Sequence, residues 1–524
     1  MMRVNERGDG FMKKQIVIMC ILLFSLSACQ PTPKEAAVVD KSEGIAEESI
    51  IPVDDNTPKN LNVPKQWKEV IERSDGFIRI EADYEMNIPE VYNTPIYSYK
   101  VSILSEERLK ELCDYFAEGN RYYQIQKMTK DELLAEKEKM ENHIGWWGRY
   151  RGNYDGMVTL DKDLERIEEL IEKAPKEQEA KKYIDVELTT PYQLEEEYVR
   201  HDRIFRWNWW HYDTDKEIAF AAYIDKGQEV DPLIRMTNYE AGVGSTTQFL
   251  YCQGNWLDER DFENNFYRME TYSDGEREYI ERVYRAMQEL RTPDFVEEDA
   301  IKIANDALSE LGIEDMELLS CKEAVGIAQT RSWAGVDDES AEKSFGYSLR
   351  FGPKCKELVA MSYRWNNGMP STEELAETVY APLINTEQTH MIVTKDGIQK
   401  FEWTDISEKT GMVVENTKLL SFDEIKNKVA DHLLYEMVNK LGIEKKNEGY
   451  VERYVVKDVQ LRMANVNAFN DPYTVWRVPV WYFEFYEFRS FPWGEEGERD
   501  EVSMSTQPVM INAIDGGYVS VAEE

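Results

Sequence analysis

The stretch after Pro293 restricts the fold most, because one pattern of helix and strands occurs there twice. The first copy opens with an apolar stripe at helical spacing from Ala300 to Leu311, followed by Gly312. The second carries a stripe from Ile425 to Leu441, followed by Gly442. Glycine suits the position after a helix because it adopts the left-handed conformation without steric cost. We therefore expect helices over 297–311 and 422–441.

Apolar strands follow both helices, and each copy closes with a hairpin built around Asp-Gly. The turns are Asp396-Gly397 and Asp515-Gly516, and Asp-Gly between apolar strands is a strong hairpin signal. One helix laid on one antiparallel sheet, repeated, is an α+β arrangement. We expect Gly312 to superpose on Gly442 and the two Asp-Gly pairs on each other. Coincidence between two short matches is the alternative.

The preceding half reads as an N-terminal α+β domain over 62–292. Ser105 and the pair Thr129 and Glu132 are predicted to cap two of its helices. The expected domains are therefore 62–292, 293–410 and 411–524, and we expect 293–524 to fold without the first half. The expected elements are helices over 105–117, 129–142, 161–173 and 276–290, and strands over 77–80, 97–103, 218–224, 233–238 and 246–252.

A short targeting pattern opens the chain. Lys13 and Lys14 precede nine consecutive apolar residues, Ile16 to Phe24, and Leu26-Ser27-Ala28-Cys29 closes the segment. Nine residues cannot cross a bilayer as a helix, which needs roughly 20. The pattern is typical of a signal sequence before a cleavage site, over residues 1–28.

The last four residues of that segment match the lipobox of bacterial lipoproteins, in which the cysteine receives a diacylglyceryl group. Cys29 is therefore the predicted lipid anchor, holding the chain to the outer side of a cell membrane. An ordinary secretory signal with a chance cysteine is the alternative. Residues 29–61, rich in Pro, Glu, Asp, Ala and Ser, are expected to form a disordered tether.

Net charge limits the partners. The chain carries −39 at pH 7, and loss of residues 1–28, with four basic and two acidic residues, leaves −41. Anionic headgroups and nucleic acid attract basic surfaces and repel a body this acidic. We therefore expect membrane attachment through the lipid alone and no nucleic-acid partner.

Four cysteines remain after processing: Cys113, Cys252, Cys321 and Cys355. Their spacing excludes a small disulfide scaffold and a CxxC-type metal or redox site. Cys321 and Cys355 fall on consecutive predicted strands, where a disulfide across the hairpin is one interpretation. Free buried thiols are the alternative.

The sequence has no motif of a known catalytic or cofactor site, because GxSxG, HExxH, Walker A, GxGxxG and a complete EF-hand loop do not occur. The five histidines have no ligand spacing, and we predict neither a cofactor nor a metal. His432 and Glu436 lie one helical turn apart, which suits a metal, but a solvated pair on the polar face is the favoured interpretation.

Aromatic residues are densest between Phe205 and Tyr212. Trp207, Trp209 and Trp210 are candidates for stacking on a sugar or gripping a peptide. The favoured alternative is that they belong to the core of an aromatic-rich domain.

Two features of the second copy, Arg477-Val478-Pro479-Val480-Trp481-Tyr482-Phe483 and Ile511-Asn512-Ala513-Ile514-Asp515-Gly516, resemble the PepSY-like fold and the end of YycI-type proteins. Those proteins regulate a cell-wall sensor kinase from outside the membrane. The resemblance covers about a fifth of the chain and implies two tandem PepSY-like units but no site residues. The chain lacks the N-terminal transmembrane helix of YycI-type regulators, so their mechanism does not carry over intact.

The whole chain also resembles an uncharacterised family of lipoproteins from Gram-positive anaerobes. The lipobox carries this resemblance together with Ile80-Glu81-Ala82-Asp83, Ile88-Pro89 and Met128-Thr129-Lys130-Asp131-Glu132-Leu133. Our first hypothesis is a non-enzymatic lipoprotein that binds an extracytoplasmic protein. A glycan- or peptide-binding lipoprotein is the second, and an enzyme of unrecognised type is the third.

Overall fold

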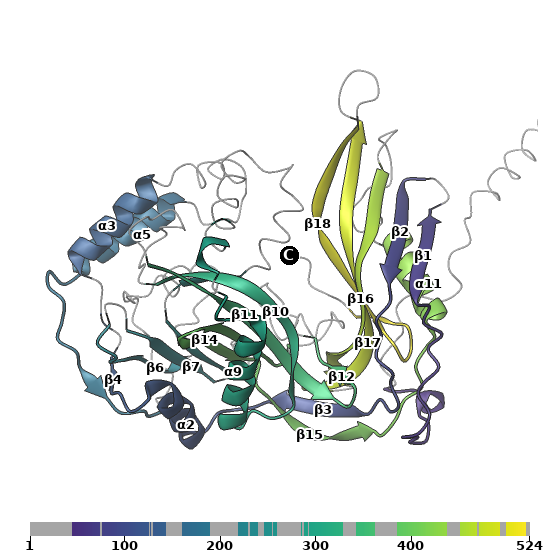
Figure 1. Cartoon of the computed structure of the whole chain (residues 1–524), viewed down its shortest axis with the longest axis horizontal. Coiled ribbons are helices and arrows are strands. Elements are labelled where there is room, and N and C mark those ends of the chain that lie inside the picture. The colour runs from purple at the N-terminus through teal and green to yellow at the C-terminus, as the bar shows by residue number, and fades with distance from the viewer. Residues whose placement is uncertain are drawn as a thin grey trace, which may run out of the picture.

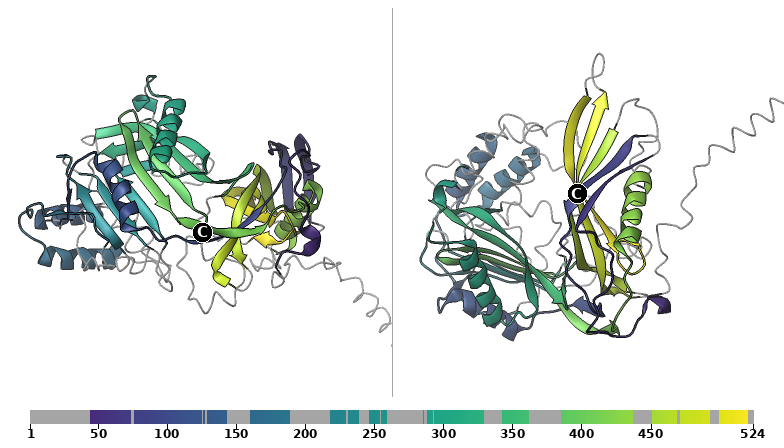
Figure 2. Two further views of the ribbon diagram at one scale, coloured as in Figure 1. Left: turned by 90° about the horizontal axis from the view of Figure 1, so that it is seen from below. Right: turned by 45° about the vertical axis from the view of Figure 1, so that its right-hand side comes forward.

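The computed structural model describes residues 44–73, 76–124, 126, 129–142, 160–188, 218–228, 231–238, 246–253, 255–258, 285, 288–291, 293–328, 342–361, 385–436, 451–468, 471–492 and 499–519. Within these residues the strands form two sheets, one of eight strands and one of eleven. Figures 1 and 2 show the larger sheet, with helices α2 and α9, at one end of the molecule and the smaller sheet, with α11, at the other. The α+β class agrees with the sequence at this level.

The eleven-stranded sheet is antiparallel throughout, in the order β5-β4-β6-β7-β8-β14-β13-β11-β10-β9, with β12 paired to the end of β11. Its strands are β4 (Tyr122–Tyr123), β5 (Tyr183–Ile184), β6 (Ile218–Ile224), β7 (Leu233–Thr237), β8 (Gln248–Cys252), β9 (Asn255–Asp258), β10 (Met316–Ala328), β11 (Glu342–Cys355), β12 (Leu358–Val359), β13 (Gln388–Thr394) and β14 (Gly397–Thr404).

Helices α2 (Glu106–Ala117) and α9 (Glu297–Glu310) cover one face of this sheet (Figure 1). Ser105 caps α2 as predicted, since its side chain accepts a hydrogen bond from the Arg108 amide. Phe116 of α2 stacks on Tyr251 with the ring centroids 4.4 Å apart. Burying an aromatic or aliphatic side chain of this size contributes about 1.5–3 kcal/mol, so these helices fix the covered face of the sheet.

The eight-stranded sheet runs β1-β2-β16-β17-β18-β19, and β3 pairs with both β17 and β15. The β2–β16 pair is parallel, whereas the others are antiparallel. The strands are β1 (Gln66–Glu72), β2 (Ile78–Glu85), β3 (Ile96–Val101), β15 (Ser407–Val414), β16 (Val451–Ala468), β17 (Asp471–Pro492), β18 (Arg499–Asn512) and β19 (Tyr518–Val519).

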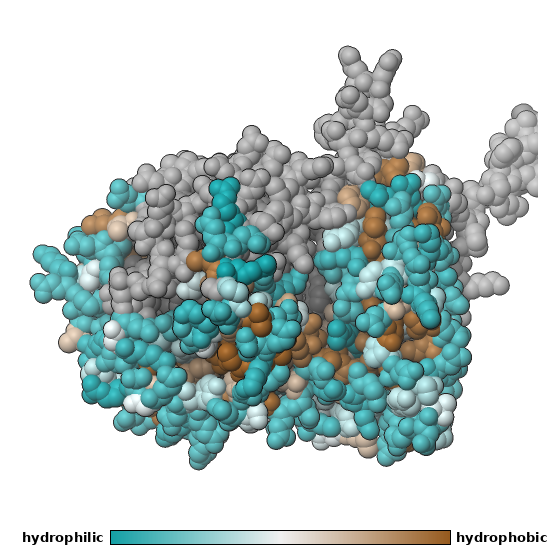
Figure 3. Space-filling model, in the orientation of Figure 1, coloured by the Kyte–Doolittle hydropathy of each residue, from teal (hydrophilic) through white to brown (hydrophobic). Residues whose placement is uncertain are grey.

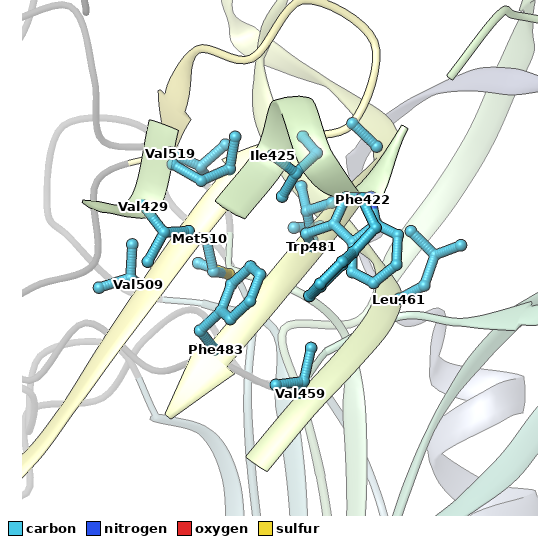
Figure 4. Close-up of a cluster of buried hydrophobic side chains, with 14 of the residues drawn as sticks. Phe422, Ile425, Val429, Val459, Leu461, Trp481, Phe483, Val509, Met510 and Val519 are labelled. Atoms are coloured by element: carbon cyan, nitrogen blue, oxygen red, sulfur yellow. The ribbon is translucent and has the colours of Figure 1, made fainter. Parts of the chain in front are cut away.

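Helix α11 (Phe422–Asp431) buries its apolar stripe on this sheet. The predicted capping box is present, because the Ser421 side chain bonds the Glu424 amide and the Glu424 side chain bonds the Ser421 amide. Figure 4 shows Phe422 and Ile425 of the helix among strand residues such as Trp481. The apolar spacing predicted from the sequence therefore faces the sheet that follows it in the chain.

Two further helices, α3 (Lys130–Asn142) and α5 (Leu160–Lys173), pack on each other through a small cluster that includes Leu133 and Ile167. The Thr129 hydroxyl accepts from the Glu132 amide, as the predicted capping box requires. These helices lie at the end of the molecule far from α11 (Figure 1).

The Asp-Gly turns lie where the sequence placed them. Gly397 (φ 101°) is the first residue of β14, after the two turn residues that follow β13, and Gly516 (φ 76°) lies between β18 and β19. Gly312 follows α9 with φ 61°, whereas Gly442 lies outside the described residues. Positive φ at these three positions is the conformation that glycine adopts without steric cost.

The sheets do not follow the predicted domain boundaries. Strands β1–β3 belong to the eight-stranded sheet and β4–β9 to the eleven-stranded one, although all nine fall within 62–292. Strand β8 pairs with β14, so a sheet crosses the boundary at 292, and the boundary at 410 falls inside β15. Pairing between strands far apart in the chain therefore divides the first half between the two sheets.

The predicted disordered tether is wrong for its second half. Residues 44–61, which we call the strap, pack along the eight-stranded sheet and include a short 3-10 helix, η2 (Glu47–Ser49). Ile45 lies partly buried against the core and Leu61 is buried in it. The polar composition of residues 29–61 predicted disorder, but a few aliphatic residues are enough to hold an extended segment against an existing sheet.

The surface seen in Figure 3 is mostly hydrophilic over the described residues, as expected for a chain of charge −39. Apolar residues show mainly between the two sheets and beside α11 (Figure 3).

Candidate functional site

Several predicted site residues lie outside the described part of the chain. These are the predicted lipid anchor Cys29 and the predicted ligand-binding residues Trp207, Trp209 and Trp210. The cysteines of the predicted disulfide and His432 can be placed, whereas the side chain of Glu436 lies outside the described part.

The predicted disulfide between Cys321 and Cys355 is wrong. Both lie on the expected strands, but the register sets Cys321 opposite Leu349 and Met316 opposite Pro353. Five residues of strand, about 17 Å, therefore separate Cys321 from the end of the ladder beside Cys355, whereas a disulfide needs Cα atoms within about 7 Å. Cys113, Cys252, Cys321 and Cys355 are all free thiols.

The favoured interpretation of His432 as a solvated residue is also wrong, because its side chain is buried. His432 opens a π-helical turn, η5 (His432–Glu436), after α11 and stacks on Tyr518 with the ring centroids 4.0 Å apart. His432 follows Val429 by three residues and therefore lies on the buried face of the helix. Packing against an aromatic ring accounts for its position.

The residues that carry the PepSY-like resemblance form core. Trp481 and Phe483 are buried beneath α11. Arg477 is buried too, with its guanidinium 3.9 Å from the Tyr99 ring centroid and its Nε donating to Asn465 Oδ1 at 3.2 Å. These positions hold the eight-stranded sheet together and offer no chemistry at its surface.

A buried polar cluster lies on the face of the eleven-stranded sheet away from α2 and α9. It comprises Ser348 on β11, His390 on β13, and Lys400 and Glu402 on β14, which we call the His390 network. Cross-strand pairing brings them together: His390 lies opposite Glu402, and Ile392 lies opposite both Ser348 and Lys400. The intervening residues, such as Met391 and Phe401, point to the covered face.

The geometry of the His390 network looks like a serine–histidine–carboxylate arrangement. Ser348 Oγ lies 2.9 Å from His390 Nε2, and Glu402 Oε2 lies 3.7 Å from His390 Nδ1. Lys400 Nζ stands between the last two groups, 3.2 Å from Nδ1 and 2.7 Å from Glu402 Oε2. The side chains of His390 and Lys400 are only 10% and 12% exposed.

The protonation of this network opposes nucleophilic catalysis. A lysine ammonium only donates, so Lys400 requires an unprotonated Nδ1, and the neutral ring then carries its proton on Nε2. Burial lowers the pKa of His390, and the positive charges of Lys400 and Arg350 lower it further. Nε2–H therefore donates to Ser348 Oγ, whereas activating a serine needs a lone pair on that nitrogen.

A second polar cluster joins the strap to the body around Asn416, which is 1% exposed. Asn416 Oδ1 accepts from the Thr94 amide at 3.1 Å and from Lys59 Nζ at 2.7 Å. Its Nδ2 donates to the carbonyl of Pro52 at 2.8 Å. One side chain thus ties the strap to the loop before β3 and to the linker before α11.

Sequence reasoning missed both clusters. The His390 network depends on register between strands, although a lone histidine within an apolar strand was a signal for it. The strap had a weaker signal, the aliphatic residues Ile45, Ile50, Ile51 and Leu61 among polar neighbours.

In the described part of the chain, no three His, Cys, Asp or Glu side chains are grouped so that they could hold a metal. None of the helices described there is both long and apolar enough to span a membrane.

Comparison with known proteins gives no family. No protein-family model matches the chain, and neither does any curated protein. A crystal structure of an uncharacterized protein from Eubacterium rectale ATCC 33656 is similar over 89% of this chain and 96% of that one. The TM-score is 0.39 at 11% sequence identity, too low to support an argument about fold or function.

Proposed function

We propose that this chain is a membrane-anchored extracytoplasmic lipoprotein that binds another protein and does not act as an enzyme. The observation that carries the proposal is the position of the first described residue, Gly44, next to Ile45, which packs against the core of the eight-stranded sheet. Gly44 follows the lipobox cysteine, Cys29, by only 15 positions. A lipid on Cys29 would therefore hold the body directly.

The arrangement of the two helices and their strands supports the binding part of the proposal. Helix α9 precedes β10, β11, β13 and β14, and α11 precedes β16 to β19; in both sets the strands are neighbours in that order. We propose that these are two PepSY-like units. Tandem units of this kind offer sheet edges and faces to a partner.

The protonation of the His390 network supports a non-enzymatic role. A serine-reactive fluorophosphonate should leave Ser348 unlabelled in the folded chain, because the adjacent histidine donates to the hydroxyl. Labelling that disappears in Ser348→Ala would contradict this part of the proposal.

The anchor is tested by feeding cells an alkyne analogue of palmitate and comparing Cys29→Ser with the control Cys321→Ser. Incorporation should be lost only in Cys29→Ser, with the protein released or kept as precursor. Equal labelling in both variants would place the lipid elsewhere. Crosslinking in intact cells, followed by capture, should then recover one protein partner with the anchored form.

A second candidate, glycan or peptide binding, is favoured by aromatic side chains on the face of the eight-stranded sheet away from α11. Tyr482, Tyr486 and Phe488 lie there half-buried, and the guanidinium of Arg453 lies 4.3 Å from the Phe488 ring centroid. Binding of the purified chain to a glycan or peptide array, lost in Tyr486→Ala, would favour this candidate over a protein partner.

A further inference from the structure

Four exposed apolar side chains lie on the strap and at the end of β15, on either side of the contact that the strap makes with residues 416–418, directly after β15. Ile50 and Val53 of the strap are 46% and 50% exposed, and Met412 and Val413 of β15 are 53% and 38% exposed. We call these four residues the strap patch. Single exposed aliphatic residues are ordinary on protein surfaces, so their grouping needs an explanation.

Hydrogen bonds hold the two halves of the strap patch together. Ile50 forms an antiparallel bridge with Thr417, and the Ile51 amide donates to the Asn416 carbonyl at 3.2 Å. The carbonyl of Pro52, next to Val53, accepts from the Asn416 side chain. Val413 is four residues from Thr417, about 13 Å of extended chain at most.

The backbone of β15 explains why two adjacent residues are exposed. Strand β15 pairs with β3 alone among the described strands, and its register shifts between Met412 and Val414. Side chains on a regular strand alternate between faces, but Val413 is an extra residue between the Met412–Tyr97 and Val414–Ile96 pairs. A bulge of this kind interrupts the alternation, so the side chains of Met412 and Val413 are not forced to opposite faces.

The position of the strap patch relative to the anchor suggests what covers it. The strap enters the structure at Gly44, and the 15 residues from Cys29 span at most about 50 Å when fully extended. A lipid on Cys29 therefore holds the start of the strap within about 50 Å of the bilayer. In Figure 1, β15 and the strap lie along the same lower side of the molecule.

The charges around the strap patch indicate that a membrane contact there would be apolar and not electrostatic. Asp54, Asp55, Glu408 and Glu415 flank it, with Lys409 and Lys418 nearby, so no basic surface is present to attract anionic headgroups. Four partly exposed side chains can bury too little apolar surface to recruit the protein from solution on their own. This burial is enough to orient a molecule already held at the surface, where its effective concentration is in the millimolar range.

We propose that the strap patch rests on the bilayer and sets the orientation of the anchored body. This inference deepens the proposed function, since it requires the lipid on Cys29. The partner is the apolar and interfacial region of a zwitterionic membrane, contacted through Ile50, Val53, Met412 and Val413.

The test uses the lipid-bearing full chain, reconstituted in phosphatidylcholine vesicles. A Cys321→Ser background removes the only thiol among the four described cysteines that is not buried. An environment-sensitive fluorophore is attached at Val53→Cys, at Met412→Cys, or at the control Leu134→Cys. Leu134 is 44% exposed and lies on α3, at the far end of the molecule.

Blue-shifted emission and quenching by nitroxide lipids are expected at positions 53 and 412, with emission at 134 unchanged from water. If the protein floats with the vesicles but all three positions report water, the orientation is wrong while the anchor stands. If the chain purified from cells does not float, the anchor fails and the inference fails with it.

Discussion

Asn416 joins three parts of the chain through one buried amide, so its removal should be costly. Asn416→Ala removes the partner of the Thr94 amide and of the Pro52 carbonyl, and leaves the Lys59 ammonium with the Thr417 carbonyl, 2.8 Å away. Each buried polar group left unsatisfied costs about 1–3 kcal/mol. We expect a loss of roughly 2–4 kcal/mol, measured as a lower urea midpoint with an unchanged slope, and faster amide exchange over residues 50–59.

The exposed Asn56 provides the matched control, because Asn56→Ala removes the same chemical group from the surface of the strap. Equal midpoints for the two variants would show that the strap does not depend on Asn416.

Lys59 gives the strap a pH dependence. In the folded chain burial lowers the pKa of Lys59 to about 8, although the negative charge of Glu357 raises it in part. In the unfolded chain the pKa keeps its ordinary value near 10.5. Between those values the unfolded state binds more protons, so this group raises stability as pH increases. The stability of the wild type relative to Lys59→Met should therefore rise from pH 8 to pH 10 and stay constant from pH 6 to pH 7. A flat difference throughout would contradict the lowered pKa.

At the scale of the element, β11 depends on the absence of a side chain at Gly346. A Cβ built there would lie 2.6 Å from the carbonyl oxygen of Val393 on the neighbouring β13. Backbone cannot move aside cheaply, so Gly346→Ala should destabilise the chain by about 1–3 kcal/mol in chemical denaturation. Gly411→Ala is the control, since its Cβ would meet only the Ser98 hydroxyl at 3.6 Å. Equal stability of the two variants would mean that β11 and β13 can separate locally.

Elements whose signals are local in the chain were predictable. Caps at Ser105, Thr129 and Ser421 mark helices that the structure contains, because a capping side chain acts on amides two or three residues away. The Asp-Gly turns follow the same logic. The separation of Cys321 from Cys355 was not predictable, since it depends on the register of β10 against β11, and neither strand alone encodes that register.

At the scale of the whole molecule, the sheets decide which fragments fold. Residues 293–524 lack β8, which pairs with β14, and β2 and β3, which pair with β16 and β17. Contrary to the sequence-based expectation, we expect this fragment to show no cooperative thermal transition, whereas residues 44–524 should show one. A sharp transition in the fragment would mean that the C-terminal strands are stable with those edges unpaired.

The candidate site was less predictable than the fold for the same reason. Ser348, His390 and Glu402 come from three strands, and their contact exists only once β11, β13 and β14 are aligned. The lipobox proposed at Cys29, by contrast, is a contiguous sequence pattern, so its prediction does not depend on the fold.

The parallel pair β2–β16 can form only late in synthesis, because its two strands lie far apart in the chain. Ile78 pairs with Glu452, about 370 residues further along the chain. At about 5–20 residues per second, ribosomes need roughly 20–75 s to supply the second strand after the first. During this interval β2 lacks its partner β16, so Trp67, Ile78 and Ile80, which the complete sheet buries, are exposed to water. A chain that stops early leaves these residues exposed for good, which makes truncated products ready substrates for proteases and chaperones.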